Sequence, residues 1–241
     1  TIMGFDLSQI ELRVAALLSG DSDLVAAYRE GVDLHKSRAE QIFGDGIEDR
    51  PDFKELRQAG KMINFADLFR SGPSTMQSQL LAMTGQLHPL DFFKDVARNR
   101  SKDRPGLWNW QNYIIKKTRK NGYFHLPFTG QSRYFQGGDK WDVNEIVNFP
   151  IQTTAGNTLL CIQHEMHNNL LPPLNIRESE VKMFMFLNVY DAFYLDVAPG
   201  WEETAKQSVA AAVREVAERG YWANLQEYYG REIPLEYDCE G

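Results

Sequence analysis

Two apolar segments at opposite ends of the chain, each carrying an aspartate, constrain the fold most. Residues 2–7 have the pattern of a short strand that ends beside Asp6, and a helical pattern follows it. Residues 183–198 are typical of two strands joined by a tight turn at Asp191. Strands of this kind can bring both aspartates to one edge of a sheet. Paired carboxylates usually hold Mg²⁺ over phosphate groups, because hard cations prefer oxygen ligands.

The residues between these segments have mainly helical periodicity. We expect helices at about 9–19, 21–30, 34–43, 51–70, 74–83, 88–99, 106–121, 152–170, 202–219 and 221–229, and strands at 2–7, 122–127, 131–136, 183–189 and 192–198. Pro172-Pro173 should end the helix at 152–170. Strands at both ends, with helices between them, predict an α+β fold in which a helical subdomain interrupts a sheet.

The bulk composition is that of an ordinary globular protein. A length of 241 residues allows one large domain or two small ones. The two cysteines, Cys161 and Cys239, lack CxxC spacing, which suits a reducing compartment. No apolar run approaches the ~18 residues of a membrane helix, and no signal peptide is visible. We therefore expect a cytoplasmic protein that is neither secreted nor bound to a membrane.

Charge is distributed unevenly along the chain, whose formal net charge is −7. Residues 94–140 contain eleven Lys or Arg and three acidic residues, a local net charge of +8, with aromatic residues interleaved. Such a segment can follow a phosphate backbone and stack on bases. It can equally be a solvated helical face with a few core aromatics, and composition alone does not separate these interpretations.

A second pattern lies in the helix expected at 51–70. Arg57, Lys61, Phe65 and Phe69 are spaced four residues apart, so they form one slowly drifting stripe on the helix surface. Two cations followed by two rings make a poor core and a poor solvated face. They suit a nucleoside triphosphate, with the cations on the phosphates and Phe65 on the sugar and base.

These motifs together resemble the family A (bacterial polymerase I-like) DNA polymerases. Residues 6–13 match the family's Asp-Tyr-Ser-Gln-Ile-Glu-Leu-Arg at seven of eight places. The stripe resembles its Arg-x-x-x-Lys-x-x-x-Phe-Gly-x-x-Tyr helix, with Ala66, Phe69 and Arg70 as departures. Residues 190–192, Tyr-Asp-Ala, stand where the family has His-Asp-Glu. The three motifs occur in the family's order, and the resemblance runs from about residue 3 to about 200.

The resemblance implies a right-hand polymerase palm, an antiparallel sheet with flanking helices, into which a helical fingers subdomain is inserted. The palm would comprise residues 1–22 and 140–241, with the last motif at 189–192. The fingers would comprise residues 23–139 and carry the nucleotide-binding helix. We expect the family's thumb and exonuclease domains to be absent, so that the chain is a fragment or one subunit of a split enzyme.

By resemblance, the catalytic residues are Asp6, Asp191 and Lys61. The carboxylates of Asp6 and Asp191 and the Leu7 carbonyl would hold two Mg²⁺ ions, for which Mn²⁺ can substitute. The nucleotide-binding residues are Gln9, Glu11, His35, Arg57, Lys61, Phe65 and Phe69, and the DNA-binding residues are Arg13, Arg133, Asn148, Gln152 and Tyr190. Glu11 would exclude a ribose 2′-hydroxyl, and Phe65 should make dideoxynucleotides poor substrates. Loss of the family's Glu at Ala192 should weaken metal or primer positioning.

The expected function is template-directed DNA synthesis, in which dNTPs are added to a primer 3′-hydroxyl. The partners would be primer–template DNA, dNTPs and an upstream, thumb-bearing polymerase segment. Two alternatives stay open: a non-catalytic subunit that binds primer–template, and a polymerase with reverse transcriptase activity. The cell would be bacterial or phage-infected, and a phage origin also stays open.

Overall fold

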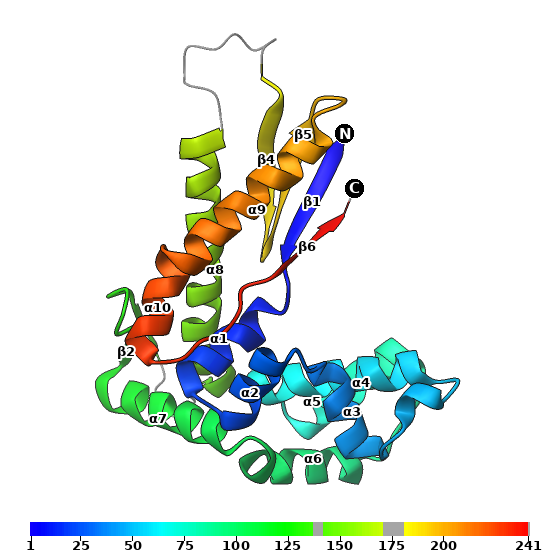
Figure 1. Ribbon diagram of the computed structural model, residues 1–241. Coiled ribbons are helices and arrows are strands. Elements are labelled where there is room, and N and C mark those ends of the chain that lie inside the picture. The colour runs from blue at the N-terminus through cyan, green and yellow to red at the C-terminus, as the bar shows by residue number, and fades with distance from the viewer. Residues whose placement is uncertain (137–141, 171–180, 241) are drawn as a thin grey trace. The chain divides into compact units, whose positions relative to one another are not determined.

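The structure is a computed structural model that describes residues 1–136, 142–170 and 181–240 (Figure 1). The chain forms two compact units, one of residues 1–14 with 151–241 and the other of residues 15–150. The family resemblance predicts subdomain boundaries after residues 22 and 139. Two helices, α1 (Ile10–Ser19) and α8 (Val143–Leu170), contain residues of both units.

An antiparallel sheet is the centre of the first unit. Its four strands among the described residues follow the order β4 (Met183–Val189), β5 (Ala192–Val197), β1 (Ile2–Leu7) and β6 (Tyr237–Glu240). The β1–β5 register pairs Phe5 with Phe193, whose rings stack 5.5 Å apart. The two strands that we predicted to carry the aspartates are therefore neighbours in one sheet.

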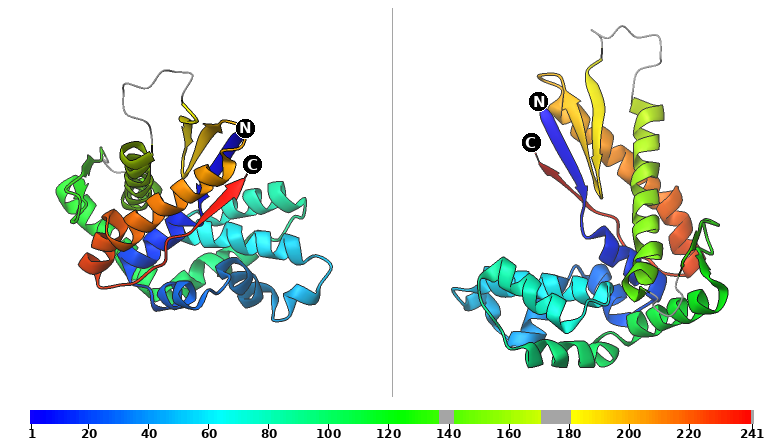
Figure 2. Two further views of the ribbon diagram at one scale, coloured as in Figure 1. Left: turned by 45° about the horizontal axis from the view of Figure 1, so that its top comes forward. Right: turned by 180° about the vertical axis from the view of Figure 1, so that it is seen from behind.

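Alternation along β1 and β5 separates an apolar face of the sheet from a polar one. Met3, Phe5 and Leu7 of β1 and Phe193, Leu195 and Val197 of β5 are buried. Figures 1 and 2 show α9 (Glu202–Glu218) lying across one face of the sheet, and its buried residues are mostly Ala and Val. Since successive side chains of a strand point to opposite faces, Asp6 lies on the face opposite Phe5.

The C-terminal strand β6 was not predicted. After α10 (Tyr221–Tyr229) the chain is fixed by the buried Trp222, whose Nε1 donates a hydrogen bond of 2.7 Å to the Ile233 carbonyl. It then pairs with β1, placing Asp238 opposite Asp6. Residues 235–240, Leu-Glu-Tyr-Asp-Cys-Glu, alternate apolar and acidic side chains. This period-two pattern was the available signal for a strand.

The second unit is mainly helical. Its helices are α2 (Ser22–Glu30), α3 (Leu34–Phe43), α4 (Phe53–Leu68), α5 (Pro73–Thr84), α6 (Leu90–Asp103) and α7 (Pro105–Asn121), with a 3-10 turn at Ile47–Asp49. One core cluster joins α4, α5 and α6 around Ile63, Met76 and Phe93. A second core packs α7 and the start of α8 against the hairpin β2 (Tyr123–His125) and β3 (Ser132–Tyr134).

The start of α8 was predicted wrongly, since the helix was expected to begin at residue 152. The helix begins at Val143 and contains Pro150. The carboxylate of Asp142 accepts hydrogen bonds from the backbone N–H groups of Asn144 and Glu145, at 2.9 and 3.2 Å, and so caps the helix. The other predicted helices and strands are confirmed apart from shifts at their ends, and Pro172-Pro173 lie outside the described residues. Within the described part of the chain, no helix has the length and apolarity needed to span a bilayer.

Candidate active site

The ends of β1 and of the β4–β5 hairpin meet in the first unit. The Leu7 N–H donates a hydrogen bond of 3.1 Å to the Asp191 carbonyl, which fixes the end of β1 to the hairpin turn. The side chains of Asp6 and Asp191 are close enough to share a hydrogen bond. Two aspartates that are 185 positions apart in the sequence are therefore neighbours in space.

Backbone strain marks the same place. Three described residues other than glycine have a positive φ, and two of them are Gln9 at 52° and Tyr190 at 56°. A left-handed residue suits the two-residue turn between β4 and β5, but glycine, asparagine and aspartate are the usual choices there. Tyr190 instead holds this conformation with its side chain 95% exposed. Such strain usually collects at functional sites, where it fixes the direction of a side chain.

The electrostatics of Asp6 favour a bound cation. Partial burial, followed by the negative charges of Asp191, Asp238 and Glu240, raises the pKa of Asp6 to about 6. An ionised Asp6 therefore needs a compensating positive charge. The described residues include no group of three or more His, Cys, Asp or Glu arranged to hold a metal ion. Two carboxylates suit Mg²⁺ nevertheless, because Mg²⁺ commonly keeps several waters and takes further oxygens from a bound phosphate.

A pocket of about 220 Å³ lies beside this pair of aspartates. It is lined by Ile10, Glu11, Gln152, Ala155, Gly156, Tyr190 and Asp191. Four of the predicted site residues, Glu11, Gln152, Tyr190 and Asp191, therefore share one concave surface. The pocket joins the first turn of α1, the middle of α8 and the hairpin turn, which are segments that the sequence separates widely.

Arg13 occupies a different environment from the one that we expected. Its side chain is buried, and Nε donates to the Ser8 carbonyl at 2.8 Å while Nη1 donates to the Pro234 carbonyl at 2.5 Å. Nη2 forms an ion pair with Glu236. These contacts tie α1 to the segment that leads into β6. They do not support the predicted contact of Arg13 with DNA, which stays a prediction.

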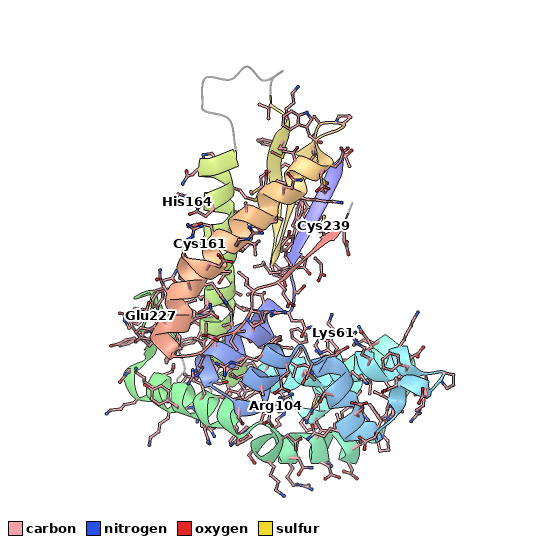
Figure 3. The ribbon with its side chains drawn as sticks, in the orientation of Figure 1. Lys61, Arg104, Cys161, His164, Glu227 and Cys239 are labelled. Carbon is pink, nitrogen blue, oxygen red and sulfur yellow. The ribbon has the colours of Figure 1, made fainter. Side chains whose placement is uncertain are left out.

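In the second unit, helix α4 carries the predicted stripe. Lys61 is exposed (Figure 3), Arg57 and Phe65 are half-buried, and Phe69 follows the end of the helix. The rings of Phe65 and Phe69 are 6.1 Å apart. The opposite face of α4, with Met62 and Ile63 among its residues, belongs to the core. The stripe is therefore a real surface of one helix, with two cations and two rings in a row.

His35 lies next to this stripe, buried at the start of α3, with its ring 6.3 Å from that of Phe65. Burial, together with the charges of Arg57 and Lys61, lowers the pKa of His35 to about 4. Two neighbours of His35 were missed in the sequence: Asp33, which pairs with Arg57, and Asn64, which contacts the imidazole. Asp33 lies two residues before His35 and Asn64 one residue before Phe65, and this closeness to predicted site residues was the available signal.

The basic segment at 94–140 is only partly a surface. Arg100 is buried and donates from Nε to Asp67 at 2.6 Å, and Arg104 is half-buried. The cations of this segment therefore do not all lie on the surface. Of the predicted DNA contacts, Arg133 pairs with Glu145, and the buried Oδ1 of Asn148 has no hydrogen-bond partner within the described residues; both contacts with DNA stay predictions.

The first unit is thus an antiparallel sheet with an aspartate pair at one end, and the second presents cations and rings on one helix. The fold agrees with the POL domain of Pol1 from M. smegmatis, described in complex with DNA primer–template and dNTP: the TM-score is 0.70 at 22% identity, over 99% of this chain and 38% of that one. The model of DNA polymerase family A matches residues 1–239, and the chain belongs to that family.

Curated relatives agree with this assignment. The thermostable DNA polymerase I of Thermus caldophilus is 29% identical over 232 residues, which are 91% of this chain and 25% of that protein. DNA polymerase I of Chloroflexus aurantiacus is 27% identical over 90% of this chain and 22% of that protein. DNA polymerase I of Mycobacterium tuberculosis is 27% identical over 98% of this chain and 24% of that protein. The chain therefore spans about a quarter of the length of these relatives.

Proposed function

We propose that this chain is the palm and fingers of a template-directed DNA polymerase that transfers nucleotides from dNTPs to a primer 3′-hydroxyl. The observation that carries the proposal is the pairing of Asp6 with Asp191 beside the pocket that contains Glu11 and Gln152. Family membership supports the same activity. In this proposal the first unit acts as the palm and the second as the fingers.

The aspartate pair would hold the divalent cations. Asp6 and Asp191, with the Leu7 carbonyl, would bind two Mg²⁺ ions, and Mn²⁺ could replace them. Bound ions would lower the pKa of the primer hydroxyl and neutralise charge on the leaving pyrophosphate. The raised pKa of Asp6 supports this role, because an added cation relieves the repulsion among the carboxylates around it.

The stripe on α4 would bind the incoming nucleotide. Arg57 and Lys61 would hold the phosphates, with Lys61 close to the reacting group, while Phe65 and Phe69 would lie against the sugar and base. His35 would donate a hydrogen bond to the phosphates. In the other unit, Gln9 and Glu11 would contact the nucleotide sugar, and Glu11 would leave no space for a 2′-hydroxyl.

DNA contacts would come from polar side chains that recognise shape rather than sequence. Asn148 and Gln152 would reach acceptors in the minor groove, where the base pairs differ least. Arg133 and Tyr190 would contact the duplex and the primer end. A thumb-bearing segment, in the same polypeptide or in a separate chain, would complete the grip on DNA, since the relatives are much longer.

Primer extension on a DNA hairpin with Mg²⁺ and dNTPs tests the proposal. Wild type should extend the primer, while Asp6→Asn and Asp191→Asn should bind the hairpin normally and fail to extend it. Glu30→Gln, which changes an exposed carboxylate of α2, is the matched control and should extend like wild type. Equal extension by wild type and both aspartate variants would contradict the catalytic role. Binding without extension by wild type would favour the non-catalytic alternative.

A further inference from the structure

Asn64 holds the imidazole of His35 in a defined orientation. Both residues are buried, with exposed fractions of 4% and 3%. The Asn64 Nδ2 atom lies 2.9 Å from the Leu34 carbonyl oxygen and 3.2 Å from Nδ1 of His35. Residue 64 is on α4 and residues 34 and 35 begin α3, so a single amide group joins the two helices.

The chemistry of this contact determines the tautomer of His35. A backbone carbonyl can only accept a hydrogen bond, so the group that Asn64 turns toward Leu34 must be its NH₂. The second hydrogen of that NH₂ points to Nδ1, which must therefore be an acceptor without a proton. The proton of the neutral imidazole then resides on Nε2, which leaves Nε2–H as the ring's hydrogen-bond donor.

The surroundings keep the ring neutral. Burial and the charge of Arg57 disfavour a positive charge on His35, Asp33 opposes them, and Lys61 adds a smaller disfavouring effect. A protonated ring would also direct an Nδ1 hydrogen at the Asn64 NH₂ group. His35 therefore offers a neutral donor rather than a third cation.

Asp33 fixes Arg57 by a second contact between α3 and α4. Its Oδ1 caps α3 by accepting from the backbone N–H groups of His35 and Lys36, at 2.9 and 3.1 Å. Its Oδ2 accepts from Nε of Arg57 at 2.7 Å. Since Nε is used in this way, both Nη groups of Arg57 keep their hydrogens for another anion; within the described residues they make no other hydrogen bond.

Close packing makes these contacts possible. A Cβ on Gly60 would lie 2.2 Å from the His35 carbonyl oxygen and 2.9 Å from the Ala39 nitrogen, and both of these are backbone atoms. Only glycine at this position allows the start of α3 to approach α4 so closely.

We propose that Asn64 and Asp33 are positioning residues of the nucleotide site: Asn64 sets the Nε2–H tautomer of His35, and Asp33 orients Arg57, so that neutral and charged donors face one triphosphate. This inference rests on the proposed function, and it adds two residues that do not themselves touch the nucleotide. The preset orientation reduces the ordering cost of binding the triphosphate.

Imidazole ¹⁵N NMR of the whole protein tests the role of Asn64 without any nucleotide. In wild type, Nδ1 of His35 should give an unprotonated signal and Nε2 a protonated one. In Asn64→Asp the new carboxylate can only accept, so Nδ1 should gain a proton. A protonated Nδ1 in wild type, or the same tautomer in both proteins, would overturn the proposal.

Binding of Mg²⁺-dATP tests whether these contacts matter for the nucleotide. Asp33→Ser keeps an N-cap of similar quality but is too short to reach Arg57. Asp33→Ser and Asn64→Asp should each raise the Kd for dATP by roughly tenfold to a hundredfold. Both variants should give the spectra of a folded protein, and Asp33→Ser should change Tm little. Asn168→Asp alters an exposed Asn–His contact on α8 and should leave the Kd unchanged.

Two results of the binding assay have distinct meanings. Wild-type affinity for dATP in both Asp33→Ser and Asn64→Asp would overturn the positioning roles and leave the proposed function standing. Failure of wild type itself to bind dATP and to extend a primer would overturn the proposed function, and the positioning proposal with it.

Discussion

Asp238 lies directly opposite Asp6 in the β1–β6 ladder, while Ala192 lies opposite Asp6 in the β1–β5 ladder. Cross-strand partners project to the same face of a sheet. Asp6 therefore has a carboxylate neighbour on the side where the sequence predicted none, and a methyl group where the family has a glutamate. The hydroxyl of Ser8 donates a hydrogen bond of 2.5 Å to Asp238 and holds that carboxylate in place.

Asp6→Asn should make the metal-free protein more stable at neutral pH. The pKa of Asp6 in the folded protein is about 6, above the ordinary value of 3.8. The folded state therefore binds the proton more tightly, so this contribution to stability is complete below about pH 4 and is lost as the pH rises through about 6. In EDTA, the melting temperature should fall less from acid to neutral pH for Asp6→Asn than for wild type.

Asp45→Asn, which removes an exposed carboxylate outside the cluster, is the control and should behave like wild type. Parallel pH dependences in wild type and Asp6→Asn would show that Asp6 is not destabilised by its neighbours.

Asp238→Asn should move the acidic limb of the pH–rate profile for primer extension to lower pH. Asp238 is one of the negative charges that raise the pKa of Asp6, and extension requires the ionised form that can hold a cation. Asp196→Asn, at the other end of β5, supplies the comparison. An unchanged acidic limb in Asp238→Asn would show that Asp238 does not influence the ionisation of Asp6 during extension.

Gly60→Ala should destabilise the protein although alanine is the better helix former. The new Cβ meets the backbone of α3, and overpacking of this kind costs about 1–3 kcal/mol, against a gain of about 1 kcal/mol in helix propensity. Gly156→Ala, in the helix α8, meets nothing within 4 Å and should be neutral or stabilising. Urea unfolding of both variants tests the pair, and equal effects would argue against the close contact of α3 with α4.

Asp67→Asn should destabilise the second unit strongly. Asp67 is buried between Arg38 at 2.7 Å and Arg100 at 2.6 Å, so its removal leaves two guanidinium groups with too little negative charge. Breaking a buried ion pair typically costs about 3–5 kcal/mol. Asp91→Asn, which breaks an exposed pair with Lys94, should change the free energy of unfolding little. Similar losses in the two variants would contradict this interpretation.

Glu11→Ala should relax the choice of sugar. Glu11 lines the pocket beside Asp191, and the shorter side chain opens space for a 2′-hydroxyl. Discrimination against rNTPs should fall by roughly tenfold to a hundredfold, the range expected for a steric contact. Ratios of kcat/KM for dATP and ATP measure the change, with Glu30→Ala as the comparison. An unchanged ratio would exclude Glu11 as the sugar-selecting residue.

Local patterns in the sequence were sufficient for most of the fold. Period-two and helical patterns placed β1, the β4–β5 hairpin and α4, because each depends on side chains that are close in the chain. The Tyr190-Asp191 turn was predicted for the same reason. The start of α8 was not, because the capping carboxylate of Asp142 and packing of the helix outweigh the break that Pro150 suggests.

Residue types in the sequence also selected the aspartate pair and the stripe of α4. The alternating pattern of β6 was overlooked because the strand is short, and Trp222 and pairing with β1 hold it in place. Residue types could not separate the surface cations of residues 94–140 from Arg100, because burial beside Asp67 depends on contacts between helices that are distant in sequence.

The sequence by itself determined the chemistry that this protein carries: two aspartates, a cationic and aromatic helix face, and the order of the motifs. The tertiary structure alone decided which groups share a surface. The β1–β6 register places Asp238 beside Asp6, and the approach of α3 to α4 at Gly60 brings Asn64 to His35. Charge coupling and hydrogen-bond direction depend on distances of a few ångströms across the fold, which residue type and spacing along a chain do not specify.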